Sequence, residues 1–219
     1  IGDGLLEAGE ITHAQLVLYD LFAEKLAAYA DKGAILAQSP ADLAAKSDIL
    51  ILATKPQDME AALEAIQPAF STDTLVISIA AGLSIAFFEQ HLGAEARIIR
   101  VMPNTPAMVS AGAAGYSLSN ACTATDEALA HTIFNAIGLG LCVPESSIDA
   151  VTALSGSGPA YYFYFVECMC KAGVELGLSE EQATKLAEQT LYGAGKLLIE
   201  SDDSAQTLRE KVTSKGGTT

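Results

Sequence analysis

Two apolar segments, each followed by small residues, place the strongest restriction on how this chain can fold. Residues 48–53 and 74–79 are nearly continuous hydrophobic runs, which are typical of parallel strands buried on both faces of a sheet. The helical pattern of residues 58–70 connects them. Because open α/β sheets bind ligands at the carboxyl ends of their strands, this pair predicts half of a nucleotide-binding sheet. The alternative is a sheet of the same design that binds nothing.

The flanking sequence continues the alternation of strands and helices. Gly9 and Gly33 are expected to end two of these helices. We predict an α/β fold, with a doubly wound sheet that forms a dinucleotide-binding domain over residues 1–145. Further strands are expected at residues 16–19, 34–36, 96–101, 113–118 and 139–143, and further helices at residues 22–29, 40–46 and 126–137.

The chain beyond residue 145 changes to helices without strands. The first helix is apolar on nearly every side, so it must be buried, yet one small domain has little with which to cover it. Ser179 and Gln182 form a capping box, and the small residues 193–195 favour close packing against another helix. We predict an all-α domain over residues 146–219 that pairs with a second copy in a homodimer. Its helices are expected at residues 159–176, 179–199 and 205–212.

A serine- and glycine-rich turn at residues 149–161 leads into the first of these helices. Pro159 suits the first turn of a helix, and such an N-terminus attracts anions. Thr152, Ser155 and Ser157 add short hydroxyl groups, which are enough to hold a small carboxylate or an imine. The alternative is a well-capped helix entrance without a ligand.

Composition excludes several classes of function. The chain has 219 residues, half of them hydrophobic, and a formal net charge of −15, which disfavours binding to nucleic acid or to anionic membranes. Apolar runs are too short for a membrane span, so we expect a soluble protein. The four cysteines lack metal-site or redox spacing, so we expect reduced thiols in a cytoplasmic protein without a bound metal.

Two polar residues are candidates for cofactor contacts at strand ends. Asp20 follows the apolar residues 16–19, and an acidic residue at that position accepts hydrogen bonds from an adenosine ribose in dinucleotide folds. Asn104 lies between two prolines in a loop after residues 96–101. The alternatives are an ordinary turn residue at Asp20 and an Asx turn at Asn104.

Four motifs, taken together, resemble the pyrroline-5-carboxylate reductase family over essentially the whole chain. They are ATKPQ at residues 53–57, VMPNTP at 101–106, DAVTALSGSGP at 149–159 and VTSKGGTT at 212–219. The resemblance implies hydride transfer from NADPH or NADH to 1-pyrroline-5-carboxylate, which gives L-proline in the last step of proline biosynthesis. It also implies a Rossmann-like domain followed by a helical dimerisation domain, with homodimers that often assemble into rings.

The resemblance also assigns roles to individual residues. Thr152 would hydrogen-bond the substrate nitrogen as the catalytic residue, and backbone N–H groups at residues 217–219 would hold the substrate carboxylate. The implied cofactor-binding residues are Ala53, Thr54, Lys55, Pro56, Ala81, Asn104 and Lys211, together with Asp20. The implied substrate-binding residues are Glu145, Ser214, Gly217, Thr218 and Thr219.

The chain departs from the family pattern at three points. No strand with a G-x-G-x-x-[GA] loop precedes Ile1, so we expect the first strand and the pyrophosphate site to be missing, and activity to require their restoration. The family's C-terminal helices do not follow Thr219, and Lys215 stands where many members have proline. Asp20 favours NADH, because a carboxylate repels a 2′-phosphate, but family members often prefer NADPH or accept both.

Two other functions remain open. A 3-hydroxyacid dehydrogenase of similar build would need a catalytic lysine on the long helix, where Lys171 is the candidate, and we expect Lys171 to lie too deep in an apolar helix to serve. A non-catalytic nucleotide-binding fragment is the second alternative.

Overall fold

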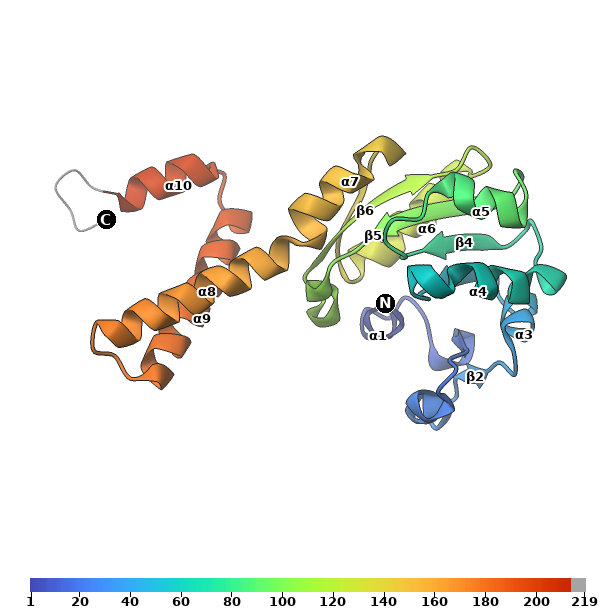
Figure 1. The fold of residues 1–219 in the computed structure, drawn as a ribbon, viewed down its shortest axis with the longest axis horizontal. Coiled ribbons are helices and arrows are strands. Elements are labelled where there is room, and N and C mark those ends of the chain that lie inside the picture. Colours follow the sequence, from blue (N-terminus) through green and yellow to red (C-terminus); the bar gives the residue numbers. More distant parts are fainter. Residues whose placement is uncertain (214–219) are drawn as a thin grey trace. The chain divides into compact units, whose positions relative to one another are not determined.

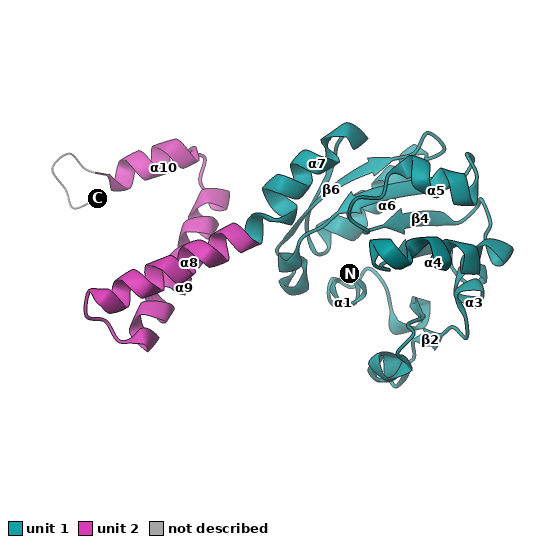
Figure 2. Ribbon diagram, in the orientation of Figure 1, with its two compact units in different colours: residues 1–159 teal, residues 160–219 magenta. Residues whose placement is uncertain are grey.

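The computed structural model describes residues 1–213, so the predicted substrate residues Ser214, Gly217, Thr218 and Thr219 lie outside the described residues. The chain divides into two compact units, Ile1–Pro159 and Ala160–Thr219 (Figure 2). The first unit combines strands and helices, and the described part of the second is entirely helical. This confirms the predicted fold class, an α/β Rossmann-like sheet followed by an all-α part.

The main sheet of the first unit has five strands in the order β3-β4-β5-β6-β7 (Figure 1). Strands β3, β4 and β5 are parallel, β6 runs antiparallel to β5, and β7 is parallel to β6. The antiparallel β6 was not predicted. Its direction follows from the short connection after β5, since a parallel neighbour needs a crossover of a dozen or more residues. The strands are β3 Ile49–Leu52, β4 Leu75–Ser78, β5 Arg97–Met102, β6 Gly112–Leu118 and β7 Gly138–Cys142.

A second, separate sheet contains only two short parallel strands, β1 Val17–Leu18 and β2 Ile35–Leu36. Both side chains of β2 are exposed. Between these strands the predicted helix of residues 22–29 is a 3₁₀ turn, Ala23–Leu26, followed by the four-residue helix α2, Ala27–Ala30. This part therefore lacks the burial on both faces that stabilises the strands of the main sheet.

Alternating side chains of the main sheet enter two separate hydrophobic cores. Val76 and Ile98 pack with one set of helices, whereas Leu75, Ile77 and Ile99 pack with another. A doubly wound sheet requires helices on both faces, and this division provides them. The first core contains α3 Pro40–Ala45, α4 Met59–Ile66 and α5 Ile85–Leu92, and the second contains α1 Gly2–Glu7 and α6 Ala124–Asn135.

Several helix boundaries follow capping chemistry that can be recognised in the sequence. The Ser179 side chain accepts a hydrogen bond from the Gln182 N–H at 3.3 Å, which confirms the predicted capping box. Gly9, Gly33 and Gly177 have positive φ values, as expected for residues that end helices. Helix α5 was not predicted, although Ser84 caps it by accepting from the Phe87 N–H at 3.2 Å.

The helical unit contains α9 Glu180–Glu200, α10 Ala205–Val212 and most of α8 Gly158–Glu175. Among its described residues, only Ala183 and Ala187 are buried. The five aromatic residues 161–165 of α8 are all more than half exposed. Such a large apolar surface is typical of a face that another chain covers.

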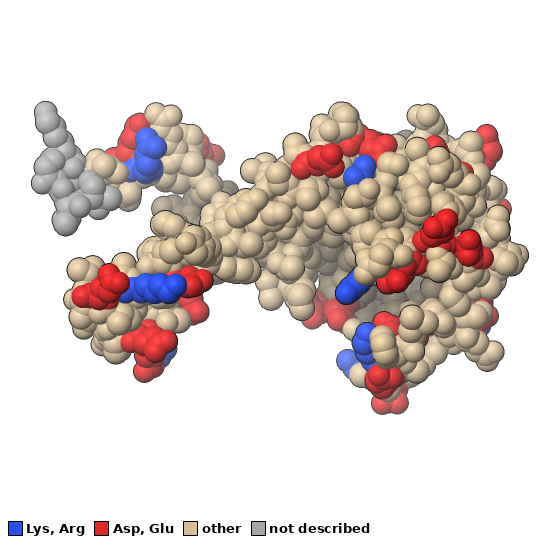
Figure 3. All heavy atoms as spheres, viewed as in Figure 1, with Lys and Arg blue, Asp and Glu red and all other residues tan. Residues whose placement is uncertain are grey.

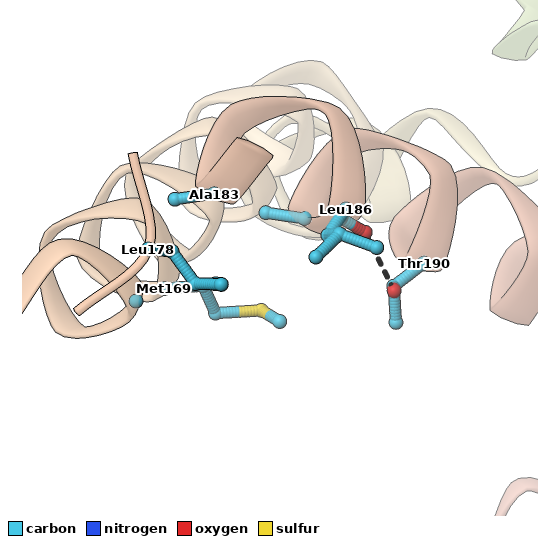
Figure 4. A pocket seen from close by; sticks show the side chains of 7 residues that line it. Met169, Leu178, Ala183, Leu186 and Thr190 are labelled. Atoms are coloured by element: carbon cyan, nitrogen blue, oxygen red, sulfur yellow. Dashed lines mark hydrogen bonds between the residues drawn. The ribbon is translucent and has the colours of Figure 1, made fainter. Parts of the chain in front are cut away.

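An apolar groove lies between α8 and α9 and has a volume of about 150 Å³ (Figure 4). Met169, Leu178 and Leu186 line it, and their side chains offer no polar group that would orient a ligand. Thr190 donates its hydroxyl proton to the Leu186 carbonyl at 2.7 Å. The groove is therefore part of the apolar surface of this unit.

Acidic side chains outnumber basic ones on the visible face of each unit (Figure 3). Many basic side chains pair with nearby carboxylates, as Lys185 does with Glu181 at 2.5 Å and Lys46 with Asp42 at 2.8 Å. No helix within residues 1–213 has the length and apolar character that crossing a membrane requires.

Gly138 is the glycine whose replacement should damage the fold most. Its φ is +146°, and an added Cβ would lie 2.0 Å from the Gly112 carbonyl oxygen of the neighbouring strand. We expect Gly138→Ala to lower the free energy of unfolding by about 3 kcal/mol, because rigid backbone must move. Gly2→Ala is the control, since its Cβ would meet only Leu16 at 3.8 Å. Equal urea midpoints for the two variants would contradict this account.

Candidate functional site

The carboxyl ends of three parallel strands meet at one edge of the main sheet. Leu52, Ser78 and Arg100 are aligned across β3, β4 and β5, so the residues that follow these strands emerge together. This edge carries several of the predicted cofactor residues, which are Ala53, Thr54, Lys55, Pro56, Ala81 and Asn104. Ligands of open α/β sheets bind at this position.

The segment after β3 contains a small residue, Ala53, and a positively charged one, Lys55. Ala53 and Lys55 are exposed, and Pro56 starts a 3₁₀ turn, Pro56–Asp58, that leads into α4. Within residues 1–213, no ion pair involves Lys55. Ala81, after β4, is also exposed. The small alanines leave room for a flat ring, and the lysine offers a positive charge to a phosphate.

Asp20 follows β1 and lies in a turn, as the alternative to a ribose contact predicted. Its Oδ1 accepts a hydrogen bond from the Phe22 N–H at 2.8 Å. The Lys25 Nζ lies 3.6 Å from the same oxygen and 4.5 Å from the centre of the Phe22 ring. This neighbouring cation was not predicted from the sequence. Lys25 faces the carboxylate because the chain turns back through a 3₁₀ helix, and its positive charge partly offsets the negative charge of Asp20.

Asn104 does not form the Asx turn that was its alternative role. It stands at the start of a 3₁₀ helix, Thr105–Val109, yet its side chain makes no capping hydrogen bond there. An Asx turn uses the N–H two residues further on, and Pro106 has none. The Asn104 side chain instead contacts backbone groups outside its own loop, at Ala113 and Ser155.

Thr152 lies in a turn of π-helix, Thr152–Gly156, where the sequence predicted a glycine-rich turn. The Ser157 N–H donates to the Thr152 carbonyl at 2.8 Å, the five-residue spacing of a π-helix. The turn follows a short helix, α7 Ile148–Val151. π-helical turns occur frequently at functional sites.

The hydroxyl groups of this turn face their own backbone. The Thr152 Oγ1 donates to the Ile148 carbonyl at 2.9 Å, and the Ser155 Oγ donates to the Val151 carbonyl at 3.0 Å. A carbonyl cannot donate, so each hydroxyl proton is engaged and only oxygen lone pairs remain. The family resemblance implied a hydrogen bond between Thr152 and the substrate nitrogen. With its proton donated to the Ile148 carbonyl, the Thr152 hydroxyl is an acceptor for a further partner.

Glycines allow this segment to pack closely on the sheet. A Cβ on Gly115 in β6 would lie 2.7 Å from Val151 Cγ1, and one on Gly156 would lie 2.5 Å from the Met102 Cε. Gly115 and Gly156 therefore have close-approach roles in addition to any ligand role. The π-helical turn consequently lies against β5 and β6 within the first unit.

Glu145 belongs to a cluster of charged residues that was not predicted from the sequence. Its Oε1 accepts from the Arg100 Nη1 at 3.0 Å and from the Ile85 N–H, at the start of α5, at 2.7 Å. Arg100 is only 10% exposed and also lies 3.9 Å from Asp149. The ion pair thus ties the segment before Thr152 to β5 and α5. Arg100 lies among the apolar residues Ile98, Ile99 and Val101 of β5, and a charge at that position was the signal available in the sequence.

Two lysines of the helical unit were named in the sequence analysis. Lys211, a predicted cofactor residue, is exposed and forms an ion pair with Asp203. Lys171 is not deep in an apolar helix, which corrects our expectation, because its side chain is 68% exposed. Its Nζ donates to Glu167 at 2.6 Å, and this contact raises the pKa of Lys171. A catalytic lysine acting as a base needs the opposite shift.

All four cysteines are free thiols, and burial raises the pKa of the Cys122 and Cys142 thiols. Within residues 1–213, no group of three potential metal ligands comes together.

A Rossmann-like sheet with small and polar residues at its strand ends, followed by an apolar helical unit, defines the class of two-domain nicotinamide-dependent oxidoreductases. Pyrroline-5-carboxylate reductase of Pseudomonas aeruginosa is 40% identical over 218 residues, which cover 99% of this chain and 80% of that protein. The chain belongs to the pyrroline-5-carboxylate reductase family. Its residues 145–219 match the profile "Pyrroline-5-carboxylate reductase dimerisation", and residues 1–82 match "NADP oxidoreductase coenzyme F420-dependent".

Solved structures agree with this assignment. The pyrroline-5-carboxylate reductase of Coxiella burnetii has a TM-score of 0.89 and 35% identity, covering 99% of this chain and 81% of that one. The pyrroline carboxylate reductase of Plasmodium falciparum, solved with NADP bound, has a TM-score of 0.86 and 34% identity, covering 98% and 79%.

Removing the partner of Glu145 should loosen the segment that precedes Thr152. We expect Arg100→Met to lower the free energy of unfolding by about 2 kcal/mol, since a carboxylate loses its partner but remains 36% exposed to water. Arg100→Lys, which retains the positive charge, should lower the free energy of unfolding by less. Urea unfolding followed by circular dichroism measures both. Equal losses for methionine and lysine would show that packing, and not the ion pair, sets the stability.

Proposed function

We propose that this chain reduces 1-pyrroline-5-carboxylate to L-proline, with NADPH or NADH as hydride donor, in the last step of proline biosynthesis. The observation that carries the proposal is its 40% identity to a pyrroline-5-carboxylate reductase across 99% of the chain. Hydride joins the carbon of the C=N bond, and the electron pair of that bond moves to nitrogen. A nicotinamide held at the strand ends would supply the hydride, and the protein would orient the two reactants.

Thr152 is the proposed catalytic residue, and its geometry suggests how it acts. While its proton is donated to the Ile148 carbonyl, its oxygen can accept a hydrogen bond from a further partner. The protonated iminium form of the substrate has an N–H to donate, whereas the unprotonated imine has none. Thr152 therefore selects the form whose carbon is already electrophilic, so the reaction needs no separate general acid.

The edge formed by β3, β4 and β5 is the proposed cofactor site. Ala53, Thr54, Lys55 and Pro56 would line the cofactor after β3, and Ala81 would do so after β4. Lys55, exposed and without an ion pair in the described part of the chain, suits the pyrophosphate side. Asp20, after β1, would accept from the adenosine ribose. The family resemblance adds Asn104 near the ring and Lys211.

Substrate contacts are proposed on residues from two parts of the chain. Glu145 is a proposed substrate residue, although its carboxylate already binds Arg100 and Ile85. The backbone of residues 217–219 would hold the substrate carboxylate, as glycine-rich N–H groups do elsewhere. The proposed substrate residues outside the described part of the chain are Ser214, Gly217, Thr218 and Thr219.

The domain organisation and assembly are part of the proposal. We infer a dinucleotide-binding domain over residues 1–145 and a helical dimerisation and substrate domain over residues 146–219. The compact units divide later, after Pro159, whereas the match to the dimerisation profile begins at residue 145. The exposed aromatic residues 161–165 support a homodimer, and a larger ring is its extension. Unpaired cysteines support a cytoplasmic location, and the acidic surface argues against nucleic-acid or membrane partners.

The direct test is oxidation of NADPH and NADH in the presence of 1-pyrroline-5-carboxylate, with proline identified as the product. With the family's glycine-rich strand and loop restored before Ile1, we expect proline to form at the rate of cofactor oxidation. In the reverse assay, we expect no reduction of NAD⁺ or NADP⁺ by hydroxyisobutyrate. Lys171→Ala should leave the rate unchanged. Activity with hydroxyisobutyrate that disappears in Lys171→Ala would instead support the 3-hydroxyacid dehydrogenase. Cofactor binding without turnover would support the non-catalytic alternative.

Replacing Thr152 tests the catalytic role. We expect Thr152→Val, which keeps the shape but removes the oxygen, to lower kcat/KM about a hundredfold, by analogy with the loss of an oriented hydrogen bond at other active sites. Thr152→Ser should retain most of the activity. Steady-state kinetics with varied pyrroline-5-carboxylate measure both.

The pH dependence distinguishes an acceptor from a donor at position 152. If Thr152 accepts from the iminium, kcat/KM falls about tenfold for each pH unit above the substrate's own pKa. A profile that stays flat across that pKa would mean that the unprotonated imine reacts and that Thr152 donates.

Lys25 is expected to influence the choice of cofactor. Lys25→Ala leaves the Asp20 carboxylate without its neighbouring cation, so NADPH should bind about fivefold more weakly while NADH binding stays constant. Lys32→Ala, which changes net charge equally, is the control. Calorimetric titration with each cofactor gives the dissociation constants. An equal loss of NADPH affinity in Lys25→Ala and Lys32→Ala would show that net charge, and not the position of Lys25, is the cause.

A further inference from the structure

The Asn104 side chain bridges two backbone segments that are distant in sequence. Its Oδ1 accepts from the Ala113 N–H at 2.8 Å, at the start of β6. Its Nδ2 donates to the Ser155 carbonyl at 3.1 Å, inside the π-helical turn. One partner can only donate and the other can only accept, so the orientation of the amide is fixed by chemistry.

The proline in its own motif removes the α-helical donor for the Ser155 carbonyl. In a continuous α-helix the Ser155 carbonyl would accept from the N–H of residue 159. Residue 159 is proline, which has no N–H. A partly buried carbonyl without a partner is unfavourable, and the Asn104 amide provides the missing hydrogen bond.

We propose that Asn104 is a positioning residue that acts through Thr152, by holding the π-helical turn against the ends of β5 and β6. This rests on the proposed function of Thr152. Ser155 and Thr152 belong to the same turn, which the Ser157 N–H closes onto the Thr152 carbonyl. Holding Ser155 therefore fixes the direction of the Thr152 oxygen relative to the strand ends.

This role differs from direct cofactor contact. The amide oxygen and nitrogen of Asn104 are both used by backbone partners. A ring contact through these atoms would have to break one of the two bonds. Asn104 consequently fixes the distance between the cofactor edge and the substrate-binding turn without touching the reacting atoms.

Asn104→Asp isolates the donor, because aspartate keeps the oxygen for Ala113 but loses the N–H for Ser155. The matched control is Asn135→Asp, whose Oδ1 accepts from the Gly140 N–H at 2.8 Å in the same unit. Amide hydrogen exchange of residues 152–157 should become about tenfold faster in Asn104→Asp and should not change in Asn135→Asp. This readout needs no activity, so it separates failure of the bridge from failure of the proposed function. Unchanged exchange in Asn104→Asp would overturn the proposal.

A double-mutant cycle tests the coupling to Thr152. Asn104→Asp should lower kcat about tenfold in the unmodified enzyme but less than about twofold in Thr152→Val, since the residue being positioned is then absent. The dissociation constant for NADPH should stay the same. Equal effects in both backgrounds, or a loss confined to NADPH affinity, would show that Asn104 does not act through Thr152.

Pro159→Ala provides a second test that stays informative if Asn104→Asp folds poorly. Alanine at position 159 restores an N–H for the Ser155 carbonyl, so Asn104→Asp in this background should recover slow exchange and most of its lost kcat. If the double variant folds but neither slow exchange nor kcat recovers, the Asn104 bridge does not replace the hydrogen bond that Pro159 removes from Ser155.

Discussion

Parallel pairing of β3, β4 and β5 is the constraint from which the rest of the site follows. The pairing aligns Leu52, Ser78 and Arg100, so three connections leave the sheet at the same edge. It is stable only because alternating apolar side chains enter a core on each face. The residues at the edge are therefore free to be small or polar, since the burial that holds the strands lies behind them.

The sequence predicted those features whose signals are local. Continuous apolar runs gave β3 and β4, and the serine cap at Ser179 gave the start of α9. The contacts that shape the site are not local. Arg100 and Glu145 are 45 residues apart, and Asn104 and Ser155 are 51 apart, so periodicity carries no information about either pair. The π-helical turn was missed for a similar reason, because glycine and serine indicate a turn without specifying its hydrogen-bond spacing.

The helical unit shows how composition can indicate a missing partner. Its first helix has aromatic residues at five consecutive positions, 161–165, and these point in all directions around the axis. A single copy buries only Ala183 and Ala187 among the described residues. Since burial of apolar surface is the main stabilising contribution in folding, association with another chain would supply most of the stability of this unit. The match to a dimerisation profile agrees with this energetic argument.

Under the catalytic role proposed for Thr152, the direction of its hydrogen bonds would explain how a reductase of this kind can operate without charged catalytic residues. A hydroxyl whose proton is held by Ile148 presents a partial negative charge, and an iminium nitrogen carries a positive one. The attraction is strongest before the reaction and weakens as hydride transfer neutralises the nitrogen, so taken alone it stabilises bound substrate more than product. Its benefit to the rate must come mainly from orientation, because a fixed acceptor sets the plane of the C=N bond relative to the cofactor edge. Precise placement of the π-helical turn then matters more than the strength of any single hydrogen bond, and the Asn104 bridge to Ser155 provides that placement.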